Sequence, residues 1–235
     1  MKYMGSKTRI AKHILPIILK DRKDGQAWVE PFVGGGNMID KVDGIRYGFD
    51  LNKYAIAGLV SIRDCLYDLP KNNSQFTEDM YKELRSNDDY NHKGYASFAL
   101  SYGGKFMGGW CRGNKPNGEP RDYVREAYNN AVKQSPKLQG VTLYSCSYSD
   151  ISIPHNSIIY CDPPYQNTTS YKDGFSHDGF WQWCRDMANK GHTVFVSEYV
   201  APSDFECVWE KEIVSSLTVN TGNKKGVERL FRVAK

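Results

Sequence analysis

The sequence predicts an α/β fold, in which strands and helices alternate along the chain and an inserted lobe interrupts the alternation. Short apolar runs of strand length recur between segments whose apolar residues have helical spacing. Three consecutive glycines join the first strand to the next helix. A central stretch dense in glycine, basic and aromatic residues has no such periodicity. With 235 residues, the chain fits one large domain or a core domain carrying an insertion.

The part of the chain before residue 68 contains a strand, a glycine loop, a helix and a second strand that ends on an acid. This order is typical of half of a nucleotide-binding α/β unit. Pro16 lies inside the first helical pattern, where a proline predicts a kink or a break. The predicted elements are a helix over 10–19, a strand over 26–31, a glycine loop over 32–37, a short helix from Met38, a strand over 45–50 and a helix over 51–66.

The α/β pattern resumes after residue 139. Apolar runs of strand length again flank a segment with helical spacing. The last two runs are expected to form terminal antiparallel strands. The predicted elements are strands over 141–146 and 157–161, a helix over 180–189, a strand over 192–197 and the terminal strands over 205–209 and 229–233.

Residues 68–139 form the predicted insertion, a mainly helical lobe with a hairpin loop. Helical patterns cover 77–85 and 123–133, and the pair 117–118, Asn-Gly, is a strong hairpin-turn signal. Between residues 101 and 137, seven basic and three acidic residues give an excess of +4, which equals the net charge of the whole chain. A polyanionic partner is therefore expected to bind this lobe.

Bulk properties favour a cytoplasmic protein. No apolar run approaches the length of about 20 residues that spans a bilayer. The first seven residues lack the apolar core of a secretory signal. The six cysteines form no C-x-x-C pair, and none has a nearby histidine at zinc spacing. We therefore expect buried reduced thiols, no bound metal and no membrane contact.

The motif Asp162-Pro163-Pro164-Tyr165 follows a strand and carries the most chemical information in the chain. The prolines fix φ and remove two backbone donors, while their carbonyls remain able to accept hydrogen bonds from an exocyclic amine. Asp162 also accepts, and Tyr165 offers a ring face for stacking. Such a site suits a flat, amine-bearing base taken out of a helix. A rigid turn at the end of a strand is the alternative explanation.

The glycine loop and Asp50 together predict a nucleotide cofactor. An acid that ends the second strand is placed to hold ribose hydroxyls. The loop contains neither G-x-G-x-x-G nor the lysine of a phosphate-binding loop. A cofactor with a ribose and no pyrophosphate fits better, and S-adenosylmethionine (AdoMet) is such a cofactor. A tight strand-to-helix turn explains the glycines alone nearly as well.

Four segments carry a resemblance to a known family: 3–7, 32–36, 49–52 and 160–165. In sequence and order they resemble the adenine-N6 DNA methyltransferases of the Dam type, particularly phage-encoded orphan members. The resemblance spans nearly the whole chain. It implies a Rossmann-like AdoMet-dependent methyltransferase sheet with helices on both faces, in the cytoplasm of a bacterial or phage-infected cell. It also implies a catalytic domain over 1–67 and 140–235 with a target-recognition insertion over 68–139.

The resemblance further assigns roles to individual residues. Asp162, Pro163, Pro164 and Tyr165 become the catalytic motif. Cofactor binding falls to Tyr3, Met4, Lys7, Phe32, Gly34, Gly36, Asp50, Leu51, Ser147, Tyr148 and Asp162. For Tyr148, a place in the ordinary core stays open, and for Lys7, a solvated charge at a helix start.

Sequence recognition is expected from the insertion, because arginine is the usual reader of guanine and other basic residues contact phosphate. Trp110 suits either the space left by a flipped base or the core of the lobe. The same basic residues would also suit a solvated surface loop. The predicted DNA-binding residues are Lys105, Arg112, Lys115 and Arg121 in the lobe, and Lys224 and Lys225 near the C-terminus.

The predicted activity is transfer of a methyl group from AdoMet to N6 of a flipped-out adenine in duplex DNA. Hydrogen bonds from the amine to Asp162 and to the Pro163 carbonyl favour the transition state, where nitrogen gains positive charge. In relatives, Asn at the acid's position goes with other amines and Ser with cytosine N4, so Asp162 favours adenine. Cys161 should point away from Asp162, against cytosine-C5 chemistry.

Two alternatives remain from the sequence: a methyltransferase of RNA or of a protein side chain, and an inactive DNA-binding relic. We expect a monomer or weak dimer with no obligate protein partner. The sequence does not specify the DNA target site.

Overall fold

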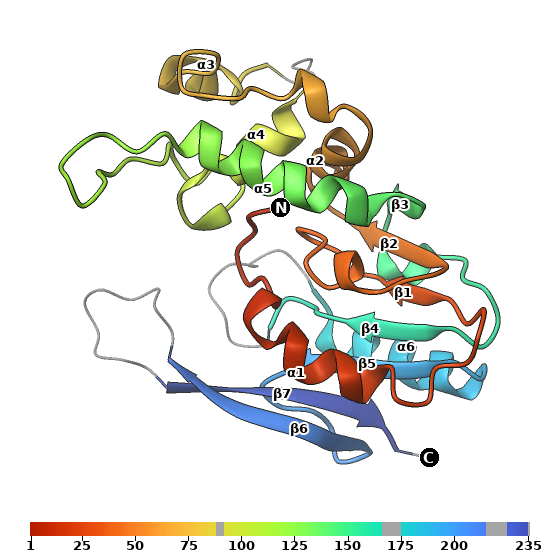
Figure 1. Ribbon diagram of the computed structural model, residues 1–235. Helices are drawn as coiled ribbons and strands as arrows, with labels where there is room; N and C mark the ends of the chain where they lie inside the picture. The colour runs from red at the N-terminus through yellow and green to blue at the C-terminus, as the bar shows by residue number, and fades with distance from the viewer. Residues whose placement is uncertain (88–91, 166–174, 215–224, 235) are drawn as a thin grey trace.

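The computed structural model describes residues 1–87, 92–165, 175–214 and 225–234. Seven strands form one sheet in the order β3-β2-β1-β4-β5-β7-β6 (Figure 1). The first five strands in this order run parallel, whereas β7 is antiparallel to both β5 and β6. The strands are β1 (Trp28–Glu30), β2 (Arg46–Asp50), β3 (Val141–Ser145), β4 (Ile158–Cys161), β5 (Thr193–Glu198), β6 (Phe205–Val214) and β7 (Lys225–Val233).

Helices lie on both faces of this sheet, so the predicted α/β fold is confirmed. Figure 1 shows α1 on the near face and α6 on the far face. None of the helices in the described part of the chain is long and apolar enough to cross a membrane. The α-helices are α1 (Thr8–Ile18), α2 (Lys53–Asp64), α3 (Glu78–Glu83), α4 (Lys93–Ala99), α5 (Tyr123–Leu138) and α6 (His177–Asn189), and the 3-10 turns are η1 (Ile39–Lys41), η2 (Leu66–Asp68), η3 (Tyr102–Gly104) and η4 (Tyr148–Asp150).

Side-chain alternation along β4 divides the core between the two faces. Ile158 and Tyr160 pack into the hydrophobic cluster that contains the buried face of α1. Ile159 and Cys161 pack into the second cluster with Phe180 and the rest of the buried face of α6. Successive strand residues point to opposite faces, so a central strand buried on both sides is apolar throughout.

The lobe packs onto α2 through a close approach of two helices. A Cβ on Gly94 of α4 would lie 2.6 Å from the backbone nitrogen of Gly58 on α2. Buried side chains of the lobe, such as Tyr81 and Phe98, belong to the same hydrophobic cluster as α1 and α2. Figure 1 shows α3, α4 and α5 gathered beyond the β3 end of the sheet. The boundaries at 68 and 139 stay a prediction.

Several elements differ locally from the prediction, including β6, which ends at Val214 rather than 209, and β7, which begins at Lys225 rather than 229. α1 continues through Pro16 and ends two residues later, and α5 includes Pro136 and extends to Leu138 rather than 133. A proline near the end of a helix removes one hydrogen bond there, which packing offsets. The short helix expected from Met38 is a single 3-10 turn. α4 was not predicted, because all seven of its residues are buried and leave no polar face to give a helical period.

Candidate active site

The parallel strands β2, β1 and β4 bring the predicted motifs to one edge of the sheet. β1 pairs with β2 on one side and with β4 on the other. The glycine loop follows β1, Asp50 ends β2 and Asp162 follows β4. Because carboxyl ends of parallel strands meet at the same edge, the three motifs lie at one edge of the sheet, which is the edge where ligands bind in open α/β folds.

Asp50 holds the glycine loop through its carboxylate. The backbone N–H of Gly34 donates to Asp50 Oδ2 at 2.9 Å, and the N–H of Asn52 donates to Oδ1 at 2.8 Å. Burial raises the pKa of Asp50 above its ordinary value, and these two backbone donors oppose the rise. Gly34 has φ +48°, and a Cβ there would lie 2.9 Å from a ring carbon of Tyr3. The N-terminal segment therefore lies directly on the loop.

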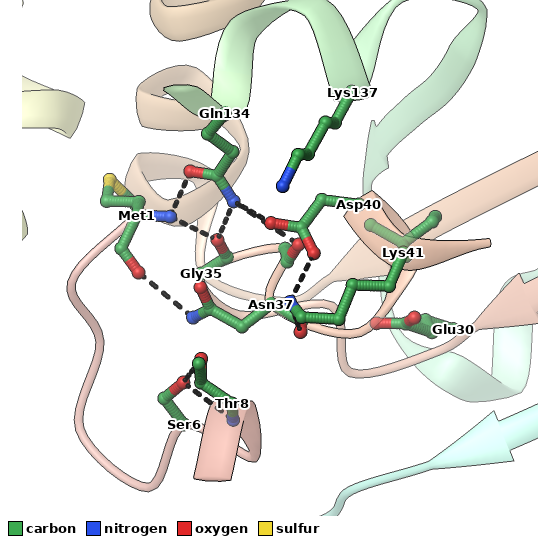
Figure 2. A network of polar contacts seen from close by, with 12 residues as sticks. Met1, Ser6, Thr8, Glu30, Gly35, Asn37, Asp40, Lys41, Gln134 and Lys137 are labelled. Atoms are coloured by element: carbon green, nitrogen blue, oxygen red, sulfur yellow. Dashed lines mark hydrogen bonds and ion pairs between the residues drawn. The ribbon is translucent and has the colours of Figure 1, made fainter. Parts of the chain in front are cut away.

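Gln134 on α5 joins the lobe's last helix to the same loop (Figure 2). Its Nε2 donates to the carbonyl of Gly35 at 3.0 Å and to Asp40 Oδ2 at 3.0 Å. The amino group of Met1 donates to the Gly35 carbonyl at 2.7 Å. Nothing in the sequence singled out Gln134, because its partners lie about a hundred residues earlier in the chain.

An aromatic cluster surrounds Phe32 in the glycine loop. The ring of Phe32 contacts those of Tyr148 at 5.4 Å and Phe180 at 5.6 Å between centroids. Ser147, which precedes Tyr148, accepts a hydrogen bond from the Ser149 N–H and begins η4. Leu51 is 78% exposed although it follows Asp50, whose carboxylate is partly buried. Leu51 therefore presents an exposed apolar surface beside Asp50, the acid that is predicted to bind the cofactor.

Asp162 forms an ion pair with Lys7. Lys7 Nζ lies 2.9 Å from Asp162 Oδ1 and 4.0 Å from Glu228 Oε2. Burial raises the pKa of Asp162, and the ammonium of Lys7 opposes that rise. Burial lowers the pKa of Lys7, but attraction to Asp162 and Glu228 raises it above its ordinary value overall. Lys7, predicted to bind the cofactor, thus contacts the predicted catalytic motif directly.

Tyr165 completes this group. Its hydroxyl donates to Glu228 Oε2 at 2.8 Å, and Lys7 Nζ lies 4.5 Å from its ring centroid. The ring of Tyr199 meets that of Tyr165 edge-on, with centroids 4.6 Å apart. Cys161, one residue before the motif, packs into the opposite cluster against α6, as strand alternation predicts.

Glu228 on β7 is a site residue that the sequence reasoning missed. It is 7% exposed and contacts two members of the predicted site. One signal was present in the sequence. The signal is Leu230, an apolar residue two positions after Glu228, because residues two apart on a strand share a face. In the structure Leu230 is fully buried. An acid at position 228 therefore lies on a buried face, where it requires a partner.

The predicted DNA-binding residues of the lobe lie at its surface, each in a separate environment. Lys105 is exposed. Arg112 pairs with Glu78, Lys115 with Glu119 at 2.8 Å, and Arg121 with Glu126. The segment 114–120 forms a turn closed by an antiparallel bridge, which is the predicted hairpin loop. Trp110 packs against Phe76 and Tyr81 and so belongs to the lobe core.

The remaining predictions concern two lysines near the C-terminus and the absence of a bound metal. Lys224 lies outside the described residues, and Lys225 is described only as the first backbone position of β7. Across the described segments, no group of three or more His, Cys, Asp or Glu side chains is arranged to hold a metal ion.

Comparisons with known proteins identify the family. The model of the D12 class N6 adenine-specific DNA methyltransferases matches residues 3–195. DNA adenine methylases from two strains of Vibrio cholerae serotype O1 are each 27% identical over 201 residues, covering 77% of this chain and 70% of theirs. A solved structure, the putative methyltransferase yhhF from Escherichia coli, is 10% identical with a TM-score of 0.41, covering 100% of this chain and 90% of that one. Because the family model covers most of the chain, the protein belongs to the D12 class of N6 adenine-specific DNA methyltransferases, and AdoMet is its cofactor.

Proposed function

We propose that the protein methylates N6 of an adenine flipped out of duplex DNA, and that Asp162 and Tyr165 hold the target base. The observation that carries this proposal is the position of Asp162. It follows β4, the immediate neighbour of the strand that leads into the glycine loop. A base held at Asp162 would therefore lie beside a cofactor held at Asp50.

The cofactor residues fit AdoMet. The partly buried carboxylate of Asp50 would accept hydrogen bonds from the ribose hydroxyls, and the exposed side chain of Leu51 would contact the adenine face. Gly34 lets the backbone approach closely, since a Cβ there would already meet Tyr3. Bound AdoMet supplies a methyl group that its sulfonium has already activated. The protein's task is then to align the target nitrogen with that methyl group.

Asp162 is suited to accept a hydrogen bond from the target amine. A carboxylate has two acceptor oxygens, and the ion pair with Lys7 engages Oδ1. The remaining acceptor capacity, with the Pro163 carbonyl, draws the amine toward tetrahedral geometry and frees its lone pair. These hydrogen bonds strengthen as charge develops on nitrogen, so they favour the transition state over the ground state.

The lobe supplies contacts to DNA in this proposal. Arg112, Lys115 and Arg121 are each at least 41% exposed, and their ion pairs lie at the surface. Exposed pairs contribute only about 0–1 kcal/mol, so phosphates or base edges displace the acids at little cost. Lys105 adds a further exposed charge. We propose duplex DNA in the bacterial or phage-infected cytoplasm as the substrate, read by a monomer or weak dimer.

Mass spectrometry of nucleosides tests the activity. Purified protein and AdoMet are incubated separately with unmethylated duplex DNA, RNA and a protein extract, and each product is hydrolysed. The proposal expects N6-methyladenine from duplex DNA alone. Methylated RNA or protein without methylated DNA would establish the rival substrate, and AdoMet binding without any product would reject the proposal. A 2-aminopurine at the target position reports flipping as an increase in fluorescence, since flipping unstacks the base.

A further inference from the structure

Glu228 lies on the last strand of the chain, and its side chain contacts two residues of the proposed site. β7 pairs antiparallel with β5, and this pairing brings residue 228 beside the motif that follows β4. Its carboxylate accepts the hydroxyl of Tyr165 at 2.8 Å and lies 4.0 Å from Lys7 Nζ. Its side chain is 9% exposed. A buried carboxylate needs such partners, and both of them belong to the proposed site.

The charges of this group do not cancel. Asp162 and Glu228 each carry a carboxylate, and Lys7 contacts both of them with a single ammonium. The pair Lys7–Asp162 alone would be neutral, so Glu228 leaves one net negative charge among these three side chains. Methyl transfer passes a positive charge from sulfonium to amine nitrogen. A fixed negative charge on the side of the amine favours that passage.

A second buried acid, Glu30, is a poor source of this charge. Burial raises its pKa well above the ordinary value, and its Oε1 accepts the Trp28 indole N–H at 2.8 Å. A raised pKa favours the neutral form of Glu30. Glu228, by contrast, lies 4.0 Å from the Lys7 ammonium and accepts a hydrogen bond from the Tyr165 hydroxyl at 2.8 Å.

We propose that Glu228 is a positioning residue of the transfer reaction, which holds the Tyr165 ring and supplies the negative charge that the neutral Lys7–Asp162 pair lacks. This inference rests on the proposed function. Glu228 acts through Tyr165 and Lys7 and need not contact the substrate. Its contacts explain why a carboxylate occupies a position on β7 that shares its face with a fully buried leucine.

Glu228→Gln tests the charge, because glutamine keeps the shape and an acceptor oxygen for Tyr165. We expect the single-turnover methylation rate at neutral pH to fall by about tenfold or more, as when other electrostatic partners are removed from an active site. Glu206→Gln, which removes the same charge at an exposed position of the neighbouring strand β6, is the matched control and should keep the wild-type rate. Thermal unfolding checks that both variants fold.

The pH profile separates an electrostatic role from a structural one. Burial, opposed by Lys7, raises the pKa of Asp162, and Glu228 raises it further. Among the described residues, the other titratable groups that act on Asp162 or are acted on by it are Tyr165, Tyr160, Tyr199, Glu30 and Cys161. Glu228→Gln should therefore move the acidic limb of the rate profile to lower pH. Glu228→Asp, which keeps the charge, should keep the limb and recover part of the rate.

Two outcomes overturn the inference: a Glu228→Gln rate within twofold of wild type, or a slower variant whose acidic limb stays in place. If wild-type protein methylates no adenine, the proposed function fails separately. The inference is then decided by the ratio of the dissociation constants of AdoMet and S-adenosylhomocysteine, which lacks the positive charge on sulfur. Glu228→Gln should weaken the binding of AdoMet more than the binding of S-adenosylhomocysteine, and an unchanged ratio would contradict the inference.

Discussion

Replacing Lys7 by methionine removes the ammonium shared by Asp162 and Glu228 while keeping an unbranched side chain. At an effective dielectric constant of about 20, a 2.9 Å separation corresponds to about 6 kcal/mol of attraction and a 4.0 Å separation to about 4 kcal/mol. Desolvation of Lys7 offsets much of this, and removing one partner of a buried pair typically costs about 3–5 kcal/mol. The Asp162 side chain is 22% exposed, so we expect about 3 kcal/mol, at the lower end of that range.

The loss of unfolding free energy in Lys7→Met should be larger at neutral pH than at acidic pH. Without Lys7, the pKa of Asp162 in the folded state rises further above its unfolded value, because the ammonium that opposed burial is gone. A carboxyl whose pKa is higher in the folded state than in the unfolded state destabilises the fold least when it is protonated. The destabilisation is therefore full at neutral pH and shrinks as pH falls through the raised pKa toward the ordinary carboxyl value.

Urea unfolding of wild type and Lys7→Met between pH 4 and pH 8 measures this difference. Lys12→Met, at an exposed position on the neighbouring helix α1, is the matched control and should cost little. A loss below about 0.5 kcal/mol, the range of ordinary surface substitutions, would refute the reasoning. An equal loss at every pH would show that packing, and not the ion pair, accounts for it.

Three further experiments test the glycine loop, its support from α5 and the DNA-binding surface. Gly34→Ala should weaken AdoMet binding by about tenfold, because the left-handed φ costs about 1–2 kcal/mol and a Cβ would lie 2.9 Å from the ring packed there. Gly25→Ala, with φ +71° but no atom within 4 Å, is its control in the same calorimetric titration and should leave binding intact. Gln134→Ala should weaken AdoMet binding several-fold without abolishing folding, and unchanged binding would show that the loop needs no support from α5. Charge reversal at Arg112 and Arg121 should lower DNA affinity and reduce the salt slope by about 0.9 for each phosphate that is no longer neutralised, whereas an unchanged slope would exclude the lobe as the DNA-binding surface.

Local motifs made most of the site predictable from sequence. Asp50 ends β2, Asp162 directly follows β4, and Gly34 lies in the loop after β1, so the rule that carboxyl ends of parallel strands share one edge brings them together. The alternation of Cys161 and Asp162 is equally local, because successive strand residues point to opposite faces. For these residues, chain position and backbone period decide the geometry.

The parts that were missed depend on contacts between distant segments. Glu228 reaches Tyr165 only because β7 pairs antiparallel with β5, and no local pattern specifies that pairing. Gln134 binds the glycine loop from a helix about a hundred residues later in the chain. α4 is buried on every side, so its sequence has no amphipathic period.

The most direct test of the central claim is single-molecule sequencing of an unmethylated plasmid treated with purified protein and AdoMet, beside an Asp162→Ala control. The account predicts marks on adenine N6 at a defined sequence and their loss in the variant, with AdoMet binding and thermal unfolding of both proteins measured alongside. Marks of equal density from the Asp162→Ala protein, or marks on another base, would contradict it.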